Sequence, residues 1–411
     1  MPEFFNVLAP DIALRTLLDR LSMRMEAETV PTYQALGRVT AEAILASENL
    51  PAFPRSTMDG YAVRASDTFG ASESLPAYLE VAGEVPMGQA SDITLAVGQA
   101  AVAYTGGMLA NGADAVVMVE NTQAIDTTSI EVFRPVAPGE NVVQVGEDVR
   151  QGEIILPAGY LCRPQDIGGL VALGITEVKA SRRPRVAIVS TGDEIVPPDA
   201  TPGPGQIRDI NTYTIAALVQ KAGGVPVPIG VVRDDYEAQR QAAVKGLSQA
   251  DILIFSAGSS VSSRDMTVQV LNSLGSPGVL VHGIAHRPGK PTIVALVEDK
   301  PAFGLPGNPV SAMIVFGILV RPTIYALTGC AQPPQPTMVR ARLTKNIPSV
   351  TGREDHVQVR LFDADRELCA EPVFGKSNLI YMLIRAAGVV VVPLDKGGLY
   401  AGEEVPVQVY D

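Results

Sequence analysis

The chain has 411 residues, 46% of them hydrophobic and 18% charged, and a formal net charge of −12 at pH 7. This length exceeds one ordinary domain, so we expect about two to four domains with full hydrophobic cores. The negative charge argues against a general binder of nucleic acids or anionic membranes. The three cysteines are far apart, which excludes a CxxC metal motif and a disulfide framework and favours a cytoplasmic protein. No run of about eighteen apolar residues is seen, so we expect no membrane span.

The first third of the chain changes character at a proline-rich break. Before the break, apolar residues at helical spacing predict a helix over Asp11–Met25, with Asp11 as its cap, and a second helix over Tyr33–Ala46. After the break, from Gly60 to Val143, short apolar runs separated by glycine turns predict a β-rich domain.

Beyond residue 185, strand-like and helix-like segments alternate. Strands are expected in the run VAIVSTGDE and over Val225–Val232 and Asp251–Phe255, and helices over Asn211–Ala222, Tyr236–Leu247 and Val310–Leu327. This alternation predicts a parallel sheet with both faces covered by helices. After the proline-rich segment Ala331–Thr337, further β-like runs predict a small C-terminal β domain.

Three glycine-rich turns follow apolar runs of this predicted sheet, within Asp251–Thr267, Gly283–Thr292 and Phe303–Phe316. Turns of this kind meet at the carboxyl edge of an α/β sheet, where ligands bind. Their small residues let backbone N–H groups approach an anion, and Arg287 and Lys290 add positive charge. We therefore expect a pocket for an oxyanion or phosphate at this edge.

Polar residues in two other turns point to the same edge. The segment Ser190-Thr191-Gly192-Asp193-Glu194 follows a strand and places two carboxylates there, although a helix-capping turn would use the same residues. The loop Ser256–Asp265 offers hydroxyls to a tetrahedral oxyanion, and Asp265 is a candidate for holding Mg²⁺ through water. The alternative for this loop is a solvated turn with a helix cap.

The histidines give no metal motif in the sequence. His282 and His286 are four residues apart, but the glycine and proline around them disfavour a helix, and no carboxylate or thiol lies beside them in the sequence. We therefore expect no transition-metal site there, and we expect His356 to be structural.

The chain resembles the molybdopterin molybdenumtransferase family, which includes the E domain of gephyrin, over essentially its whole length. The matching segments occur in the family's order. They are ALGRVTAEAILASENLPAFPRSTMDGYAVRA, TGGMLANGADAVVMVE, GENVVQVGEDVR, STGDEIV, the loop that ends at Asp265, RPGKPT, GLPGNPVSA, TGREDHVQVRL and GKSNLI. Each segment alone is modestly specific, but their combination in this order is highly specific.

This resemblance implies a multidomain α/β fold with four parts. The expected parts are a discontinuous linker domain (residues 1–50 and 142–181, although the N-terminal helix could pack elsewhere), a β-rich domain (51–141), a three-layer molybdopterin-binding α/β domain with a parallel-rich sheet (182–330) and a C-terminal β-barrel-like domain (335–411). It further implies a homodimer with an active site between subunits, in which the MDGYA segment acts across the dimer.

Site residues follow from the resemblance position by position. The catalytic positions implied are Asp59, Thr105, Asp148, Glu194 and Asp265, with Glu194 and Asp265 as ligands of Mg²⁺. The substrate-binding positions are Ser190, Thr191, Gly192, Ser259, Ser260, Ser263, Arg287, Lys290, Pro306, Gly307, Asn308, Pro309, Arg353 and Ser377. Among the latter, Arg287, Lys290, Arg353 and Ser377 are similar to residues that hold molybdate.

The activity implied is insertion of molybdate into adenylylated molybdopterin with Mg²⁺, which yields molybdenum cofactor and AMP. A molybdopterin adenylyltransferase and enzymes that accept the cofactor are the implied partners. The serine loop departs from the family's common form at Ala257, Ser263 and Arg264, and Arg287 replaces a common lysine. These departures leave open a tungstate-inserting relative and a non-catalytic scaffold that binds molybdopterin or its cofactor. A third alternative, the adenylyltransferase itself, shares only the α/β domain.

Overall fold

The computed structural model of the chain describes residues 7–257, 261–364 and 366–410. It divides into two compact units: the first comprises Met1–Ala41, Ala158–Arg163 and Glu177–Asp411, and the second comprises Glu42–Pro157 and Pro164–Thr176. The chain therefore passes from the first unit into the second and back again two times.

The centre of the first unit is a six-stranded sheet with the order β16-β13-β17-β21-β20-β18. Four neighbouring strands are parallel: β16 (Val225–Val232), β13 (Arg185–Thr191), β17 (Ile252–Ala257) and β21 (Lys300–Pro306). β20 (Ile293–Val297) is antiparallel to both β21 and β18 (Pro277–His282), so β18 again runs in the parallel direction. The strands are nearly continuous apolar runs because both faces of the sheet are covered.

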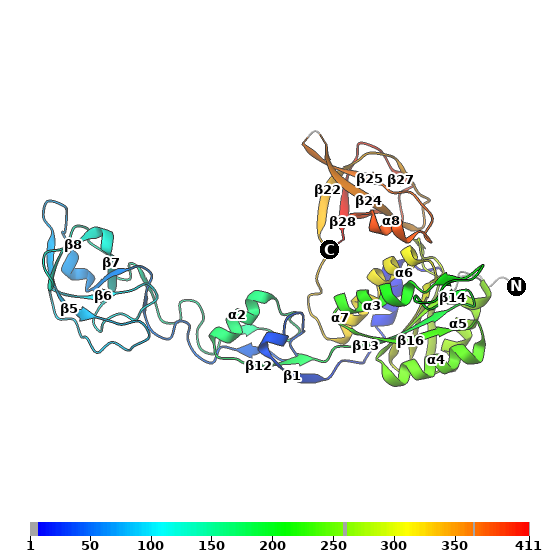
Figure 1. The fold of residues 1–411 in the computed structure, drawn as a ribbon, viewed down its shortest axis with the longest axis horizontal. Coiled ribbons are helices and arrows are strands. Elements are labelled where there is room, and N and C mark those ends of the chain that lie inside the picture. Colours follow the sequence, from blue (N-terminus) through cyan, green and yellow to red (C-terminus); the bar gives the residue numbers. More distant parts are fainter. Residues whose placement is uncertain (1–6, 258–260, 365, 411) are drawn as a thin grey trace. The chain divides into compact units, whose positions relative to one another are not determined.

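Helices pack on both faces of this sheet (Figure 1). One apolar cluster joins the sheet to α1 (Pro10–Leu18), to α3 (Asn211–Lys221) and to a continuous helical stretch made of α6 (Pro309–Val315), the π-helical η4 (Phe316–Val320) and α7 (Arg321–Leu327). A second cluster joins the sheet to α4 (Tyr236–Gln249) and α5 (Val261–Ser273). The predicted three-layer α/β architecture with a parallel-rich sheet is confirmed.

The helical stretch Pro309–Leu327 is long and apolar enough to cross a membrane by length and composition alone, with a mean hydropathy of 1.8. However, 61% of that window is buried inside the protein, and its apolar residues belong to the core of the first unit. Core packing therefore accounts for its hydrophobicity.

The C-terminal part of the first unit is a closed barrel of five strands. The ring runs β24 (Glu354–Ala364), β25 (Glu367–Pro372), β22 (Met338–Leu343), β28 (Glu404–Val409) and β26 (Gly388–Val392), and β26 pairs with β24 to close it. The two-residue strand β19 (His286–Arg287) comes from the α/β part and pairs with β24. A short pair, β23 (Ile347–Pro348) with β27 (Gly398–Leu399), and α8 (Ile380–Ile384) complete this part. The predicted barrel-like C-terminal domain is confirmed.

The second unit is built around another six-stranded sheet, of order β7-β4-β6-β5-β9-β8. Its strands are β4 (Gly60–Val63), β5 (Ala77–Glu84), β6 (Gln99–Ala103), β7 (Ala115–Met118), β8 (Thr122–Ala124) and β9 (Ser129–Val132). The remainder of the unit contains the pairs β2 (Ile44–Leu45) with β11 (Ile154–Leu156) and β3 (Arg55–Ser56) with β10 (Val142–Val143), together with α2 (Pro164–Ala172).

Two N-terminal predictions were wrong. The helix expected over Tyr33–Ala46 is a 3-10 turn, Thr32–Gln34, followed by turns and β2, because Gly37 has a left-handed φ of 68° that ends helical geometry. Backbone bonds then tie residues 37 to 41 to segments far along the chain. The first helix ends at Leu18, well before Met25, and Asp11 lies inside its first turn, where it pairs with Arg15 rather than capping the helix.

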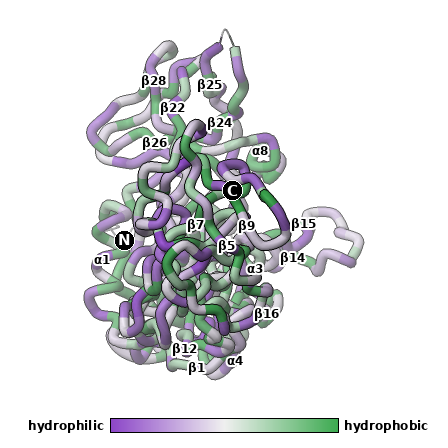
Figure 2. The backbone as a smooth tube through the Cα atoms, turned by 90° about the vertical axis from the view of Figure 1, so that its left-hand side faces the viewer, coloured by the Kyte–Doolittle hydropathy of each residue, from purple (hydrophilic) through white to green (hydrophobic). Residues whose placement is uncertain are grey.

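β1 (Ala27–Pro31) and β12 (Glu177–Ser181) form an antiparallel pair in the first unit. Elsewhere in the same unit, the segment with β14 (Ile195–Val196) and β15 (Ile207–Arg208) projects outward from the α/β part (Figure 2). It leads directly into α3, and this connection positions part of the site described next.

Candidate functional site

The glycine-rich turns lie at one edge of the first unit's sheet, as predicted. β13, β17 and β21 are parallel neighbours, and their last residues are in register at this edge: Ser190 lies opposite Ser256, which lies opposite Leu305. β18 ends at the same edge because two antiparallel steps relate it to β21. Two pockets open along this edge, and each contains predicted site residues.

The smaller pocket, of about 130 Å³, combines hydroxyl, amide and carboxylate side chains with three isoleucines and Arg208, and we call it the hydroxyl pocket. It brings together residues from β13, β17, the segment before α3 and the turn before α6. The predicted residues that line it are Ser190, Thr191, Glu194, Gly307, Asn308 and Pro309. Residues far apart in the sequence thus lie together at the carboxyl edge of the sheet, as predicted.

Two residues of the hydroxyl pocket, Asp209 and Asn211, were missed by sequence analysis. The buried Asp209 carboxylate accepts hydrogen bonds from the Ser190 hydroxyl at 3.1 Å and from the backbone N–H of Thr212 at 3.1 Å. The Asn211 amide donates to the Ser256 hydroxyl at 2.7 Å and to the Gly307 carbonyl at 2.8 Å. These bonds lock the ends of three segments together and fix the shape of the pocket.

Some polar atoms in this pocket lack a partner. The Thr191 hydroxyl and the Asn211 carbonyl oxygen are buried and make no hydrogen bond among the described residues. A buried unsatisfied polar atom costs free energy, so native proteins retain one mainly where a ligand or water completes it. Gly192 beside them has a φ of 149°, a backbone conformation that favours glycine.

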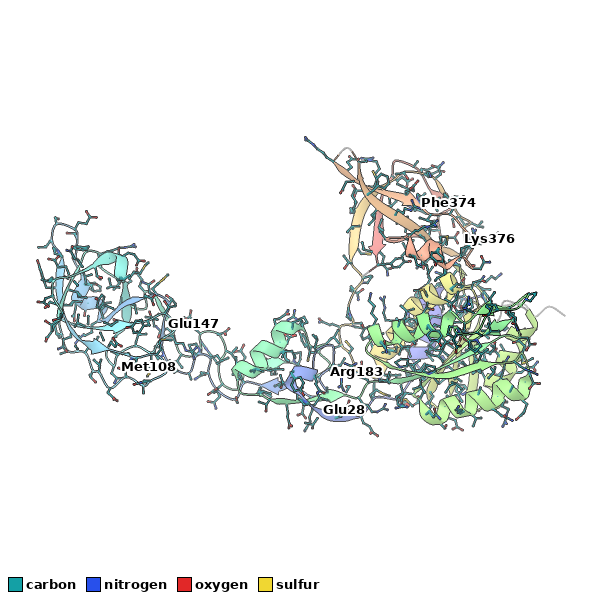
Figure 3. All side chains as sticks on the ribbon, in the orientation of Figure 1. Glu28, Met108, Glu147, Arg183, Phe374 and Lys376 are labelled. Carbon is teal, nitrogen blue, oxygen red and sulfur yellow. The ribbon has the colours of Figure 1, made fainter. Side chains whose placement is uncertain are left out.

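The larger pocket, of about 870 Å³, is lined by four basic side chains, and we call it the cationic pocket. Three of these, Arg287, Lys290 and Arg353, were predicted as substrate-binding residues. The fourth, Lys376, was missed, although it directly precedes the predicted Ser377. Figure 3 labels Phe374 and Lys376 in the segment between β25 and α8 that forms one wall of the pocket.

The arginines of the cationic pocket are oriented by one buried carboxylate. Asp355, which is 2% exposed, accepts two bonds from Arg353, at 2.8 and 3.2 Å, and lies 3.6 Å from an Arg287 nitrogen. A planar guanidinium held in this way retains N–H groups for a second anion. The arrangement suits recognition of a small dianion.

Asn308 lines both pockets and connects them. Its amide donates to the Ser377 hydroxyl at 2.9 Å, and the nearby Pro306 also lines the cationic pocket. Gly289 shapes the turn on the other side: its φ is 127°, and a Cβ there would lie 2.6 Å from a methyl carbon of Val315. The predicted RPGKP and PGNP turns therefore contribute to one continuous site.

Asp59 and Thr105 meet in the second unit. The Thr105 backbone N–H and hydroxyl donate to one oxygen of the exposed Asp59 carboxylate, at 2.7 and 2.9 Å. These bonds, the backbone one first, lower the pKa of Asp59 below its ordinary value. Asp148 lies exposed in the turn after β10, where its backbone N–H donates to the Leu50 carbonyl at 3.0 Å.

The serine loop is described only in part. Ser259 and Ser260 lie outside the described residues, as does the side chain of Ser263. Asp265 lies in α5, which begins just beyond the carboxyl end of β17, and its side chain is exposed. Neither pocket includes it, so its predicted role in binding Mg²⁺ stays a prediction.

Comparison with known proteins agrees with the sequence resemblance. Three family models match in order: "MoeA N-terminal region (domain I and II)" over residues 8–174, "Probable molybdopterin binding domain" over 187–326 and "MoeA C-terminal region (domain IV)" over 340–410. A molybdopterin molybdenumtransferase of Nostoc sp. is 35% identical over 394 residues, which is 95% of this chain and 90% of that protein. The chain belongs to the molybdopterin molybdenumtransferase family.

Other members of the molybdopterin molybdenumtransferase family match at similar levels. A molybdopterin molybdenumtransferase of Haemophilus influenzae is 33% identical and is covered over 99% of its length, for 98% of this chain. The crystal structure of a molybdopterin biosynthesis moeA protein from Pyrococcus horikoshii OT3 superposes with a TM-score of 0.86 at 32% identity, covering 98% of this chain and all of that one. Membership of the molybdopterin molybdenumtransferase family makes the protein an enzyme, and both pockets lie within a fold shared over the full length.

Proposed function

We propose that the protein inserts molybdate into adenylylated molybdopterin, in a reaction that requires Mg²⁺ and releases AMP together with molybdenum cofactor. The observation that supports this most directly is the pair of pockets with unlike chemistry that Asn308 connects. One pocket offers hydroxyl, amide and carboxylate groups, and the other offers four Lys and Arg side chains. This combination suits a substrate whose ring system makes hydrogen bonds, together with a second, dianionic substrate.

The hydroxyl pocket is suited to the pterin substrate. Among the described residues, the buried Thr191 hydroxyl and Asn211 carbonyl oxygen have no partner, and they can pair with ring N–H and carbonyl groups. A site built to hydrogen-bond a particular substrate discriminates strongly against analogues that lack those groups, because its buried polar atoms are then left unpaired.

The cationic pocket is suited to molybdate. Arg287, Arg353, Lys376 and the predicted Lys290 surround it, and Ser377 adds a hydroxyl. Charge-assisted hydrogen bonds from such groups gather an oxyanion more strongly than neutral donors do. Holding molybdate next to the bound pterin would convert an encounter between two substrates into a reaction within one complex, which is a large rate effect.

The donor set of the hydroxyl pocket fits the proposed Mg²⁺. The Glu194 carboxylate lines this pocket, and carboxylate oxygens are donors that Mg²⁺ prefers. Glu194 and Asp265 are the proposed ligands. When bound, the ion would neutralise phosphate charge on the adenylylated substrate and assist the departure of AMP.

The proposed assembly is a cytoplasmic homodimer with four domains in each chain, divided as the sequence suggests. Asp59 and Thr105 would complete the active site across the dimer, with Asp148 as a further catalytic residue. The Thr105 bonds orient Asp59 and stabilise its ionised form, which suits a carboxylate that assists phosphate or metal chemistry. A molybdopterin adenylyltransferase would supply the substrate, and enzymes that accept the cofactor would receive the product.

The test is AMP release from adenylylated molybdopterin with Mg²⁺, measured with and without molybdate. We expect release that depends on molybdate and that is lost in Asp59→Asn. Tight pterin binding without AMP release would refute the transferase and favour the scaffold alternative, with the altered serine loop as the first segment to restore. Faster release with tungstate than with molybdate would instead identify a tungstate-inserting enzyme.

A further inference from the structure

Three side chains that commonly bind transition metals meet where β19 pairs with β24. His286 lies directly opposite Glu354 in this parallel pairing, and the Glu354 backbone N–H donates to the Ala285 carbonyl at 2.8 Å. His356 is two residues beyond Glu354 on β24, and strand residues two apart point to the same face. Two histidines and one carboxylate are therefore presented together by backbone geometry.

The ligating atoms of these side chains are close enough to share one ion. One ligand atom from each of His286, Glu354 and His356 lies within 4.8 Å of the other two. The His356 Nε2 is 2.7 Å from a Glu354 oxygen, and the two imidazole rings lie edge to face with centroids 4.5 Å apart. A small shift of these side chains would bring all three atoms to ordinary metal–ligand distances of about 2.0–2.2 Å.

His286 is buried and oriented in the way that is typical of a metal-binding histidine. It is 2% exposed, and its Nδ1 is 2.8 Å from the Pro288 carbonyl, which can only accept, so Nδ1 carries the proton. Its Nε2 therefore presents a lone pair, and this buried nitrogen has no hydrogen-bond partner within the part of the chain that the structure describes. Donation of the other ring N–H to a backbone carbonyl is the usual way in which proteins orient a metal-binding histidine.

The charge state of His286 agrees with this. Burial, and then the charge of the neighbouring His356, lower its pKa to about 3. The ring is accordingly neutral at physiological pH, which is the form that binds metals.

We propose that His286, Glu354 and His356 bind one divalent first-row transition metal ion, with Zn²⁺ as the best-matched ion. Two imidazole nitrogens and one carboxylate oxygen form a known three-ligand zinc set that leaves a position open. Nitrogen donors disfavour Mg²⁺, so this site is chemically distinct from the oxygen-rich hydroxyl pocket. Because His286 and His356 also line the cationic pocket, the open position faces a space that admits water or an anion oxygen.

The competing explanation is that His356 and Glu354 form a plain ion pair beside an inert His286. That pair satisfies two of the three groups, but it leaves the buried His286 nitrogen unexplained. The two explanations differ in what they predict for binding of added metal, and this difference does not depend on the transferase activity.

The experiment uses the full chain, stripped with a chelator and titrated with Zn²⁺ by calorimetry. We expect one ion per chain and a loss of affinity of about 100-fold or more in His286→Gln and in His356→Gln, since even outer-shell partners of a metal are worth about 10- to 100-fold. His282→Gln is the matched control, because it removes a histidine four residues away that is outside the trio. Excess Mg²⁺ should not displace the Zn²⁺.

Binding of Co²⁺ in place of Zn²⁺ gives a second measurement, which can be made on the wild-type chain and so does not depend on whether a variant folds. In the wild-type chain we expect visible d–d bands of a nitrogen–oxygen site without thiolate charge transfer, because none of the three cysteines belongs to the trio. Glu354→Gln, at a more accessible position, should alter those bands while thermal unfolding remains cooperative. Absence of stoichiometric binding by the wild-type chain, or equal binding by His286→Gln and His282→Gln, would overturn the proposal.

Discussion

Asp59 in the second unit and Asp209 in the first each accept two hydrogen bonds of the same kinds. One comes from a threonine or serine hydroxyl, and the other comes from a threonine backbone N–H. Asp59 is exposed and takes both bonds from Thr105, whereas Asp209 is 7% exposed and takes them from Ser190 and Thr212. The exposed carboxylate is oriented without being covered, so it stays available to a ligand. The buried one joins a strand end to a helix start, so it maintains the pocket itself.

The largest effect is expected at the buried carboxylate. Asp209→Ala leaves the buried Thr212 N–H without its acceptor and reduces the Ser190 hydroxyl to its contact with the Thr212 hydroxyl at 2.9 Å, so we expect a loss of roughly 2 to 4 kcal/mol in the free energy of unfolding. Urea denaturation measures this loss. Asp209→Asn, which keeps an acceptor oxygen, is the control and should lose clearly less. Equal losses in both variants would show that the charge, rather than the accepted bonds, stabilises the pocket.

At the exposed Asp59 carboxylate we expect a loss of activity without a loss of stability. Asp59→Asn should reduce molybdate-dependent AMP release by about 100-fold, which is typical for loss of one well-placed catalytic group. Its urea midpoint should match that of the wild type because Asp59 packs against little and the amide oxygen can still accept from Thr105. Asp92→Asn, at another exposed aspartate of the second unit, controls for loss of a negative charge. A shifted midpoint would mean that Asp59 serves the fold as Asp209 does.

Gly289 tests whether the backbone of the cationic pocket is as constrained as that of the hydroxyl pocket. Gly289→Ala places a methyl 2.6 Å from a Val315 carbon at a φ of 127°, so we expect a loss of about 1 to 3 kcal/mol in unfolding free energy. Gly397→Ala is a matched control, since a Cβ there meets no atom within 4 Å and no left-handed φ is required. If both glycines tolerate alanine equally, the turn does not depend on strain.

The sheet edge could be predicted from the sequence because it depends on local pattern alone. Buried strands alternating with helices require parallel pairing, and parallel strands end at one edge, so the turns after β13, β17 and β21 had to meet. The β-like runs after Thr337 predicted a C-terminal β domain and the family resemblance implied its barrel-like form, but its closure through the β24–β26 pair was visible only in the structure.

Pairings between distant segments could not be predicted in this way. Asp209 and Asn211 lie after the projecting β14–β15 segment, which has no apolar periodicity to anchor it, and their partners lie on other strands. No metal site was predicted at His286 because no carboxylate lies near it in the sequence. Its carboxylate neighbour, Glu354, belongs to the C-terminal barrel and lies opposite it where β19 pairs with β24. The Tyr33–Ala46 helix failed for a similar reason, because long-range backbone bonds outweighed local helical spacing.

Arg287 is an exposed cation of the larger pocket, with 63% of its side chain accessible, so its removal should be milder than any change above. Arg287→Ala should raise the molybdate concentration needed for half-maximal AMP release by about tenfold, roughly one charge-assisted hydrogen bond. Pterin affinity, measured by fluorescence titration, should change little. Thr191→Val is the mirror variant: it removes the unpartnered hydroxyl and should weaken pterin binding more than molybdate binding. Parallel changes in both affinities for either variant would show that the two pockets do not divide the substrates.

The smallest expected effect is on the pH dependence of kcat/KM, which we relate to the exposed pair Asp59 and Thr105. Thr105→Val removes the hydroxyl donor to Asp59 at 2.9 Å but keeps the backbone donor at 2.7 Å, so the lowered pKa of Asp59 should rise part of the way to its ordinary value. A carboxylate with a lowered pKa stays ionised as the pH falls, so the acidic limb of kcat/KM should move to higher pH in this variant. Thr105→Ser keeps a hydroxyl and should retain the wild-type limb. If the valine and serine variants share one profile, the hydroxyl does not tune Asp59, and the backbone N–H alone lowers the pKa of this carboxyl.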